Sequence, residues 1–180
     1  MTSEIASPLD WSHAVVELAD GGITKERAAS ASELAAVTSV LGLLALTSLT
    51  ANYRVNRLAG GGYRLAGRVN AELEQACVVT LDPVAQHMAE KFDVEFWPEA
   101  KKNETAAVMG QEASVLEGPD VEPLVDGEIT VGRIVFETIS AALDPFPRKA
   151  DAAFDWRDPA AAEPGQTSPF AALSRLKDKS

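Results

Sequence analysis

The stretch from residue 125 to residue 147, VDGEITVGRIVFETISAALDPFP, carries an apolar stripe at helical spacing. Its apolar and small residues recur every three or four positions, the period of one helix face, at Val131, Ile134, Val135, Thr138, Ile139 and Ala142. Asp126-Gly127 forms a turn before this helix, and Asp144-Pro145 ends it, because a residue before proline avoids the helical region. A lone helix of about 16 residues is only marginally stable in water, so the stripe predicts a partner surface.

Strand-like segments earlier in the chain provide that surface. Residues 63–74 alternate apolar with polar side chains, which is typical of a strand with one buried and one wet face. Residues 43–58 are also strand-like, and Gly60-Gly61-Gly62 is the strongest turn signal in the sequence. Shorter strands are predicted at residues 9–18 and 92–97, and the strand that begins at residue 63 is predicted to continue to residue 81.

A second helix is predicted at residues 25–40, with Thr24 as its N-cap and Gly42 as its end. The predicted fold is therefore α+β: a mostly antiparallel sheet packed by an N-terminal-half helix and a C-terminal-half amphipathic helix, with a flexible C-terminal tail. Residues 1–150 form a single domain with a mobile acidic loop at 99–123, and residues 151–180 form a linker and a short tail helix.

The charge of the chain is acidic overall but unevenly distributed. The formal net charge is −11, yet no Asp or Glu occurs from Leu34 to Ala71. An acidic surface attracts basic proteins and repels phosphate backbones. The bulk charge therefore favours a basic protein partner, while the acid-free window leaves a local RNA contact open through its arginines, Arg54, Arg57, Arg64 and Arg68.

A three-glycine loop would place Arg54 directly opposite Arg68 in a hairpin. Like charges opposed across two strands are unfavourable unless something anionic lies between them. That anion is either an acid of the fold, such as Glu72, or a bound anion such as an RNA phosphate. The four arginines are thus candidate contacts for RNA or another anion.

The end of the chain carries a separate pattern. Ser168 is an N-cap for a short tail helix, and its proposed partner-binding residues are Pro169, Phe170, Leu173, Leu176 and Lys177. The tail is too short to fold alone. It either docks on the domain or is a recognition segment that orders on a partner.

No catalytic motif is apparent. His13 and His87 have no Cys, His or carboxylate at metal-ligand spacing, and the single cysteine, Cys77, excludes an internal disulfide. Cys77 shares strand parity with buried residues and has no visible neighbour that would lower its pKa, so we expect an inert buried thiol. We therefore expect a protein that is not an enzyme and that has no cofactor and no metal.

The sequence also bears on localisation. Its start, MTSEIASPLDW, lacks a basic region followed by an apolar one, so no signal peptide is predicted. Residues 35–51 are uncharged but contain five Ser or Thr, and they are shorter than the ~20 apolar residues of a membrane span. We expect a soluble, cytoplasmic protein.

Three blocks of the sequence resemble the YceD family, the bacterial large ribosomal RNA subunit accumulation proteins. They are LEQACVVTLDPV at 73–84, the helix at 126–147 with its DGEI start, and SPFAALSRLK at 168–177. The last block, after an acidic linker, is the most specific. The resemblance covers the chain from about residue 64 onward and looks like an alphaproteobacterial variant. Many members carry a Cys-x-x-Cys pair in the first block, whereas this chain has only Cys77, so no metal site carries over.

The resemblance implies a non-enzymatic factor that supports large-subunit ribosomal RNA accumulation and ribosome assembly, by binding a basic ribosomal protein. The implied partners are a large-subunit ribosomal protein or the assembling ribosomal RNA. Two alternatives remain open: a direct RNA-binding module that uses the Arg-rich β-ribbon, and an enzyme whose acids cannot be recognised from one sequence.

Overall fold

The computed structural model describes residues 7–19, 21–98 and 119–154. The chain divides into two units, residues 1–149 and 150–180, and all the described helices and strands belong to the first. Most of the predicted acidic loop lies outside the described residues. The same is true of the tail residues Pro169, Phe170, Leu173, Leu176 and Lys177.

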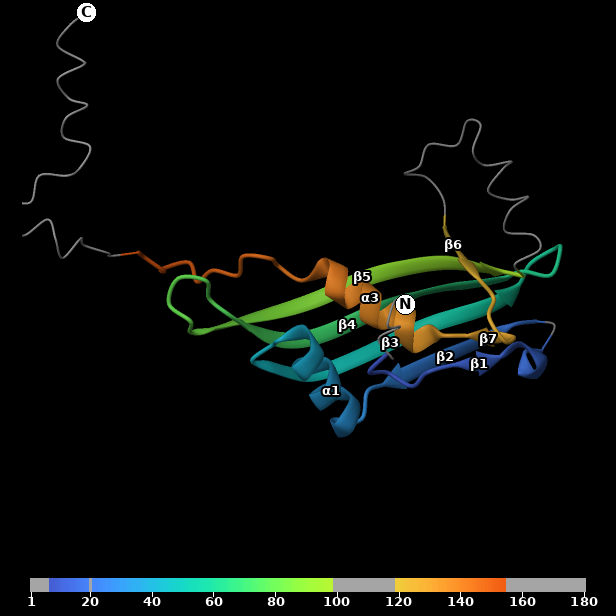
Figure 1. Ribbon diagram of the computed structural model, residues 1–180, viewed down its shortest axis with the longest axis horizontal. Coiled ribbons are helices and arrows are strands. Elements are labelled where there is room, and N and C mark those ends of the chain that lie inside the picture. The colour runs from blue at the N-terminus through green and yellow to red at the C-terminus, as the bar shows by residue number, and fades with distance from the viewer. Residues whose placement is uncertain (1–6, 20, 99–118, 155–180) are drawn as a thin grey trace, which may run out of the picture. The chain divides into compact units, whose positions relative to one another are not determined.

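The main element of the first unit is a five-stranded sheet with the order β2-β3-β4-β5-β6 (Figure 1). Every neighbouring pair is antiparallel except β5 and β6, which run parallel. A second sheet pairs β1 with β7. The strands are β1 (His13–Ala14), β2 (Ile23–Ala28), β3 (Ala45–Arg57), β4 (Tyr63–Ala76), β5 (Pro83–Trp97), β6 (Asp120–Pro123) and β7 (Glu128–Ile129).

Two α-helices are described, α1 (Ala31–Leu41) and α3 (Val131–Ala142), and a 3₁₀ turn η1 (Val15–Glu17) follows β1. The helix α3 packs on β4 and β5, and α1 packs on β3 (Figure 1). The predicted α+β fold, with a mostly antiparallel sheet and one helix from each half of the chain, is confirmed.

The amphipathic helix predicted from the apolar stripe is confirmed as α3. Its buried residues are Val131, Gly132, Ile134, Val135 and Ile139. Burying each branched apolar side chain contributes about 1.5–3 kcal/mol, so this face holds the helix on the sheet. The polar side has its own support, because Arg133 donates to Glu137 one helical turn later at 2.9 Å.

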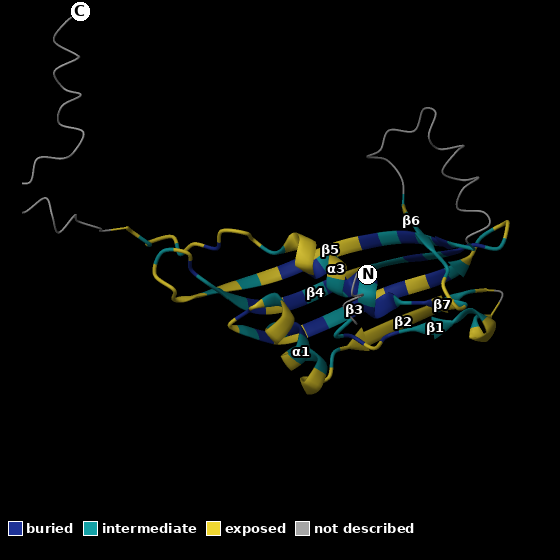
Figure 2. Ribbon diagram, viewed as in Figure 1, coloured by how far each residue is buried: buried dark blue, intermediate teal, exposed yellow. Residues whose placement is uncertain are grey.

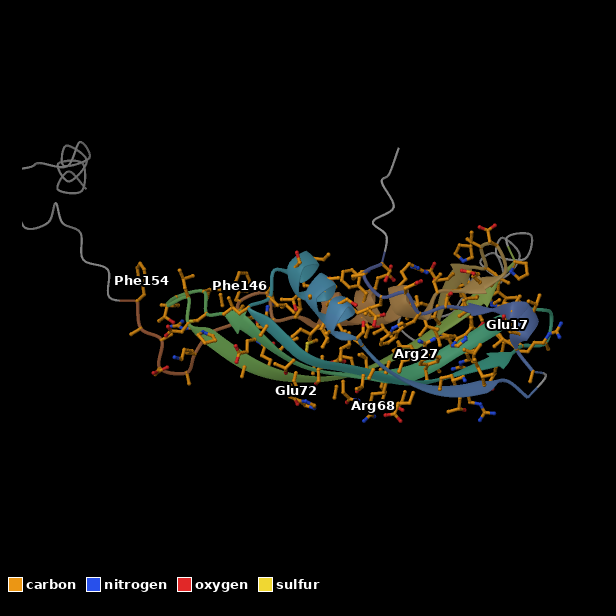
Figure 3. The ribbon with its side chains drawn as sticks, turned by 90° about the horizontal axis from the view of Figure 1, so that it is seen from below. Glu17, Arg27, Arg68, Glu72, Phe146 and Phe154 are labelled. Atoms are coloured by element: carbon orange, nitrogen blue, oxygen red, sulfur yellow. The ribbon has the colours of Figure 1, made fainter. Side chains whose placement is uncertain are left out.

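Buried residues alternate with more exposed ones along the long strands, so the two faces of the sheet differ in burial (Figure 2). The face beneath the helices, called the inner face below, carries the core residues of the long strands, among them Leu49, Tyr53, Leu65, Val69 and Phe96. The opposite, outer face carries the alternate residues, which are polar, charged or small. Among the described residues, no helix lies against this outer face (Figure 3).

The helix predicted at residues 25–40 is wrong in its first half. Residues 23–28 form β2, which pairs with β3 over its whole length. The helix begins later, with Ser30 as N-cap: its side chain accepts from the Glu33 backbone N–H, and the Glu33 carboxylate accepts from the Ser30 backbone N–H at 2.8 Å. The residues after Thr24 (Lys25, Glu26, Arg27 and Ala28) are good helix formers, which is why the sequence predicts a helix from there. Pairing with β3 overrides this helix propensity. The predicted stop at Gly42 is confirmed, with φ of 63°.

Three predicted strands also have different bounds. Only His13–Ala14 of residues 9–18 is a strand, because Leu9 and Trp11 turn into the core and the backbone meets β7 briefly. The strand β4 ends at Ala76, and a turn with Leu81 at φ of 64° separates it from β5. The strand predicted at 92–97 begins nine residues earlier, at Pro83.

The acidic loop predicted at 99–123 is wrong at its C-terminal end. Asp120–Pro123 forms β6, which pairs in parallel with residues 94–97 of β5. A parallel neighbour needs a crossover of a dozen or more residues, and the long connection between β5 and β6 provides it.

The N-terminal segment crosses the start of α3 in direct backbone contact. The Gly132 N–H donates to the Trp11 carbonyl at 2.8 Å, so Trp11 satisfies an amide at the helix start. A Cβ on Gly132 would lie 2.1 Å from the Leu9 carbonyl oxygen. Only glycine fits this crossing.

We expect Gly132→Ala to lower the free energy of unfolding by about 1–3 kcal/mol, because the new methyl group overpacks a rigid backbone contact. Chemical denaturation measures the change. Gly21→Ala is the matched control, since a Cβ there meets nothing within 4 Å. Equal stability of the two variants would contradict the close crossing.

Candidate binding groove and an arginine-bearing sheet face

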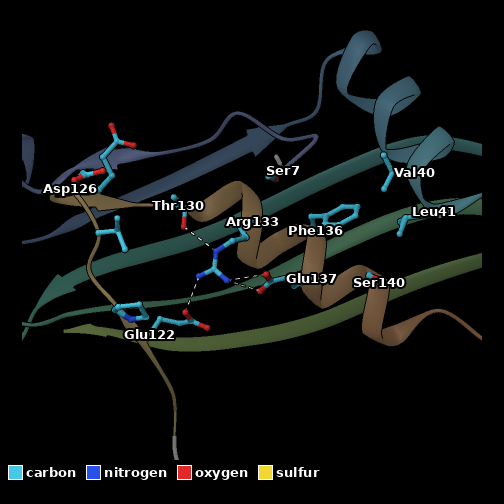
Figure 4. Close-up of a pocket in the computed structure, with 13 residues that line it drawn as sticks. Ser7, Val40, Leu41, Glu122, Asp126, Thr130, Arg133, Phe136, Glu137 and Ser140 are labelled. Carbon is cyan, nitrogen blue, oxygen red and sulfur yellow. Dashed lines mark hydrogen bonds and ion pairs between the residues drawn. The ribbon is translucent and has the colours of Figure 1, made fainter. Parts of the chain in front are cut away.

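A groove of about 840 Å³ lies between α1, α3 and the segment that joins β6 to β7 (Figure 4). Its apolar part comes from Val40, Leu41, Pro123, Val125 and Phe136. Val40 and Val125 are 53% and 58% exposed, which is unusual for branched apolar side chains. The polar lining residues are Ser7, Glu122, Asp126, Glu128, Thr130, Arg133, Glu137 and Ser140.

Arg133 lies at the centre of this groove and joins its walls (Figure 4). Its Nη1 donates to Glu137 of α3 at 2.9 Å, its Nη2 pairs with Glu122 of β6 at 3.2 Å, and its Nε donates to Thr130. Burial opposes the charged form, but the hydrogen bond to Glu137 and the charge of Glu122 outweigh it and raise the pKa of Arg133. Arg133 therefore stays charged and ties the short strand β6 to the helix.

The groove carries an excess of negative charge. Four carboxylates line it against one guanidinium, and two of the four, Glu122 and Glu137, are held by Arg133. The other two, Asp126 and Glu128, are exposed and stand at the turn before α3. The groove thus combines an apolar floor with an acidic rim.

We expect Arg133→Gln to lower the free energy of unfolding by about 1 kcal/mol, because the ion pairs of Arg133 are only partly buried. Hydrogen exchange of the β6 amides should become faster, since the tie between β6 and α3 is lost. Arg64→Gln is the control: it removes an ion pair between β4 and β5 and should leave β6 exchange unchanged. Unchanged β6 exchange in the Arg133 variant would contradict this role.

Three of the four candidate arginines lie on the outer face of the sheet, whereas Arg57 does not. Arg54, Arg64 and Arg68 alternate with buried residues, and Figure 3 shows Arg68 projecting away from the helices. Arg57 follows Val55 on the inner-face register, at the end of β3. The structure therefore does not place all four on one face.

The predicted opposition of Arg54 and Arg68 is wrong. The β3–β4 turn is centred on Gly60 and not on Gly61: the Leu58 N–H donates to the Gly62 carbonyl, which leaves residues 59–61 between them, and this places Arg54 opposite Ala66. Arg68 lies opposite Asn52 on one side and Lys91 of β5 on the other. The like charges that face each other are thus Arg68 and Lys91.

Two acids of the outer face, Glu72 and Asp93, bind other groups. Glu72 does not stand between the arginines: its Oε1 lies 2.8 Å from Nδ1 of His87. Arg64 has its own partner, because its Nε donates to Asp93 at 2.7 Å and its Nη2 bonds the second oxygen. Arg68 and Lys91 form no ion pair with any described residue.

His13 forms a partly buried cluster with Tyr53 on the inner face. Its Nε2 lies 2.8 Å from the Tyr53 hydroxyl oxygen. Burial and the positive charges of Arg27 and Lys25 lower the pKa of His13, although Glu17 opposes them. His13 is therefore a partly buried histidine with a hydrogen-bond partner, and its lowered pKa favours the neutral form.

We expect the lowered pKa of His13 to make stability pH-dependent. A base whose pKa is lower in the folded state takes up protons preferentially on unfolding, so stability falls as pH drops below the reference value of 6.5. The free energy of unfolding should therefore be lower at about pH 5.5 than at about pH 7.5, measured by urea denaturation. Glu33, whose pKa is also lowered, acts only near and below its reference value of 4.5. Cys77, whose pKa is lowered from 9.0 to about 6, contributes in the same direction as pH rises above 6, so His13 accounts for part of the difference.

In His13→Gln this difference between the two pH values should shrink, whereas in the surface variant His87→Gln it should persist. The same pH dependence in wild type and His13→Gln would exclude His13 as its source.

Cys77 lies in the turn after β4, not on a strand, and it is buried. Hydrogen bonds from the Thr80 hydroxyl and from the backbone N–H groups of Lys149 and Thr80 lower the pKa of Cys77 to about 6. The expectation of a thiol without such neighbours is thus wrong, because the sequence did not reveal the turn that folds around it. Its side chain is fully enclosed, so an external substrate does not reach it.

Within the described residues, no group of three or more His, Cys, Asp and Glu side chains has the arrangement of a metal site. None of the helices in this part of the chain is long and apolar enough to cross a bilayer.

No protein-family model, curated protein or solved structure matches the chain. The resemblance to the YceD family therefore stays a prediction from the three sequence blocks.

Proposed function

We propose that this protein is a non-enzymatic binding factor that takes a basic segment of a ribosomal protein into the groove beside α3. In this way it supports large-subunit ribosomal RNA accumulation and ribosome assembly. The observation that carries the proposal is the combination of four carboxylates and exposed apolar side chains in one groove. Exposed apolar surface rimmed by polar groups is typical of an interaction site.

A basic, amphipathic segment matches both halves of this groove. Its apolar side chains would cover Val40, Val125 and Phe136, which line the groove. Its Lys or Arg side chains would reach Asp126 and Glu128 at the rim, where charge complementarity speeds association and rejects acidic partners. Ribosomal proteins are rich in such basic segments because they bind ribosomal RNA.

The groove favours binding over covalent catalysis. Two of its carboxylates are held by Arg133, and the enclosed thiol of Cys77 is not among its lining residues. The net charge of −11 also suits a factor that holds a basic protein in solution. The enzyme alternative has no comparable observation in its favour.

We expect Asp126→Asn/Glu128→Gln to weaken binding of a basic amphipathic Lys/Leu peptide about tenfold, which corresponds to ~1.4 kcal/mol from two rim charges. Asn is chosen at position 126 because Asp126 has φ of 52°, a conformation that Asn tolerates. Isothermal titration calorimetry at low ionic strength measures the affinity. Glu26→Gln/Glu90→Gln removes the same charge elsewhere and should bind as wild type does.

The same variants test the cellular role. In a strain whose own gene is replaced by the variant, Asp126→Asn/Glu128→Gln should lower the ratio of large- to small-subunit ribosomal RNA, and the control pair should not. A nuclease-resistant pull-down should recover a basic large-subunit protein with wild type and with the control pair, but not with the groove variant. Equal peptide affinity for the groove variant and the control variant would contradict the proposal.

A further inference from the structure

The centre of the outer sheet face holds three exposed cations on three adjacent strands. Arg68 of β4 and Lys91 of β5 are directly opposed, and Asn52 of β3 completes their row. Arg54 stands two residues beyond Asn52 on β3, diagonal to Arg68. Diagonal neighbours on one sheet face lie about 7–8 Å apart, within the reach of long side chains. The three cations therefore form one cluster, called the cation cluster below.

This arrangement is costly for a free protein. Directly opposed like charges destabilise a strand pair, and Arg68 and Lys91 have no ion-pair partner among the described residues. The nearest acid on β5 is Asp93, whose two oxygens are bonded to Arg64. An anion bound between Arg68 and Lys91 would remove the repulsion.

The surface around the cation cluster is flat and able to donate hydrogen bonds. Most neighbouring outer-face positions hold side chains that are small or carry amides and hydroxyls, namely Thr24, Thr50, Asn52, Ala66, Asn70 and Ala89. The acid Glu26 stands at the end of the Arg68 row on β2, beyond Asn52 and two strands from Arg68. No bulky side chain stands between the cluster and an approaching surface. An extended polyanion can therefore contact all three cations at once.

We propose that the cation cluster, formed by Arg54, Arg68 and Lys91, binds the phosphate backbone of duplex RNA. Phosphate contacts need only cations and hydrogen-bond donors, which this face offers. A protein partner would need apolar or aromatic anchors at the centre of the interface. The exposed large apolar residues described in the first unit lie outside the five strands of this sheet, at Val16, Val40, Leu44, Val78, Leu81, Val125 and Phe146.

The same chemistry selects a duplex over a single strand. Sequence-tolerant binding of single strands uses aromatic side chains on which the bases stack. The rows of Arg54 and Arg68 hold no Phe, Tyr or Trp on this face. Trp97 lies further along β5, with its ring packed over Gly62 and its Nε1 bonded to Glu95. The cation cluster thus reads backbone charge and not base sequence.

The acidic net charge of the chain does not prevent this contact. Exposed charges more than about 8–10 Å apart are largely screened at physiological salt. The chain has no Asp or Glu from Leu34 to Ala71, which covers the outer face of β3 and much of β4. The binding surface is therefore locally basic within an acidic protein.

This inference does not depend on the groove. The groove lies on the helix-bearing side, and the cation cluster points the other way (Figures 3 and 4). Both surfaces are therefore accessible together, so one molecule could hold a basic protein segment against a neighbouring RNA helix.

The test is fluorescence anisotropy of the full chain with a labelled RNA hairpin of arbitrary sequence. With three phosphate contacts, the logarithm of the association constant should fall with the logarithm of salt with a slope of about −2 to −3. Between 50 and 200 mM salt the affinity should therefore drop by a factor of about 16 to 64. A single-stranded oligouridine of equal length should bind more weakly.

Arg68→Gln and Lys91→Gln should each weaken hairpin binding about five- to tenfold and reduce the salt slope by about 1. Lys25→Gln removes the same charge from the inner-face register of β2 and should bind as wild type does. The melting temperature of the two cluster variants should be unchanged or raised, because each removes a like-charge opposition. The groove variant Asp126→Asn/Glu128→Gln should keep its RNA affinity.

Three results would overturn the inference. The first is that the protein does not bind the hairpin at 50 mM salt. The second is that both cluster variants bind it with wild-type affinity. The third is that the single strand binds as tightly as the hairpin or more tightly. Competition by a poly-glutamate peptide as strong as that by RNA would assign the cation cluster to an acidic protein instead. Because the groove is tested with a separate peptide and separate variants, either surface can fail without the other.

Discussion

The fold depends on covering one face of a long, strongly twisted sheet. The helix α3 provides much of that cover by placing its buried residues on β4 and β5. Its start is held by the N-terminal segment, whose Trp11 carbonyl accepts from Gly132. The Trp11 indole in turn donates to Glu33 at the start of α1. One chain of contacts therefore links the N-terminal segment with both helices, and the groove lies in the space these elements leave between them.

The opposite face of the sheet has a different role because nothing in the described part of the chain covers it. An exposed antiparallel sheet needs polar alternation on its wet side, and the outer face supplies it. Polar alternation alone would favour paired opposite charges, as Arg64 and Asp93 are paired. Arg68 and Lys91 break that pattern. Locally unfavourable residue pairs are expected at ligand-binding surfaces, where binding and not stability determines the residues.

Elements with strong local signals could be predicted from the sequence, and those set by pairing could not. The helix α3 has a full apolar stripe and clear ends, and the β3–β4 hairpin has an unambiguous glycine turn. The segment Ile23–Ala28 has helix-forming residues but lies in reach of an open edge of β3. The Ser30–Glu33 capping box is the sequence signal that marks the true helix start.

The binding surfaces show the same limit at the level of single residues. The hairpin turn is centred on Gly60 instead of Gly61, and this one-residue difference places Asn52, and not Arg54, opposite Arg68. The sequence does not indicate that Lys91 lies beside Arg68, because the two residues are 23 positions apart and no local pattern connects them. The groove was invisible for the same reason, since β6 and α1 approach α3 only through the fold. Charge composition indicates which partners are compatible with a protein, but the register of its strands determines where they bind.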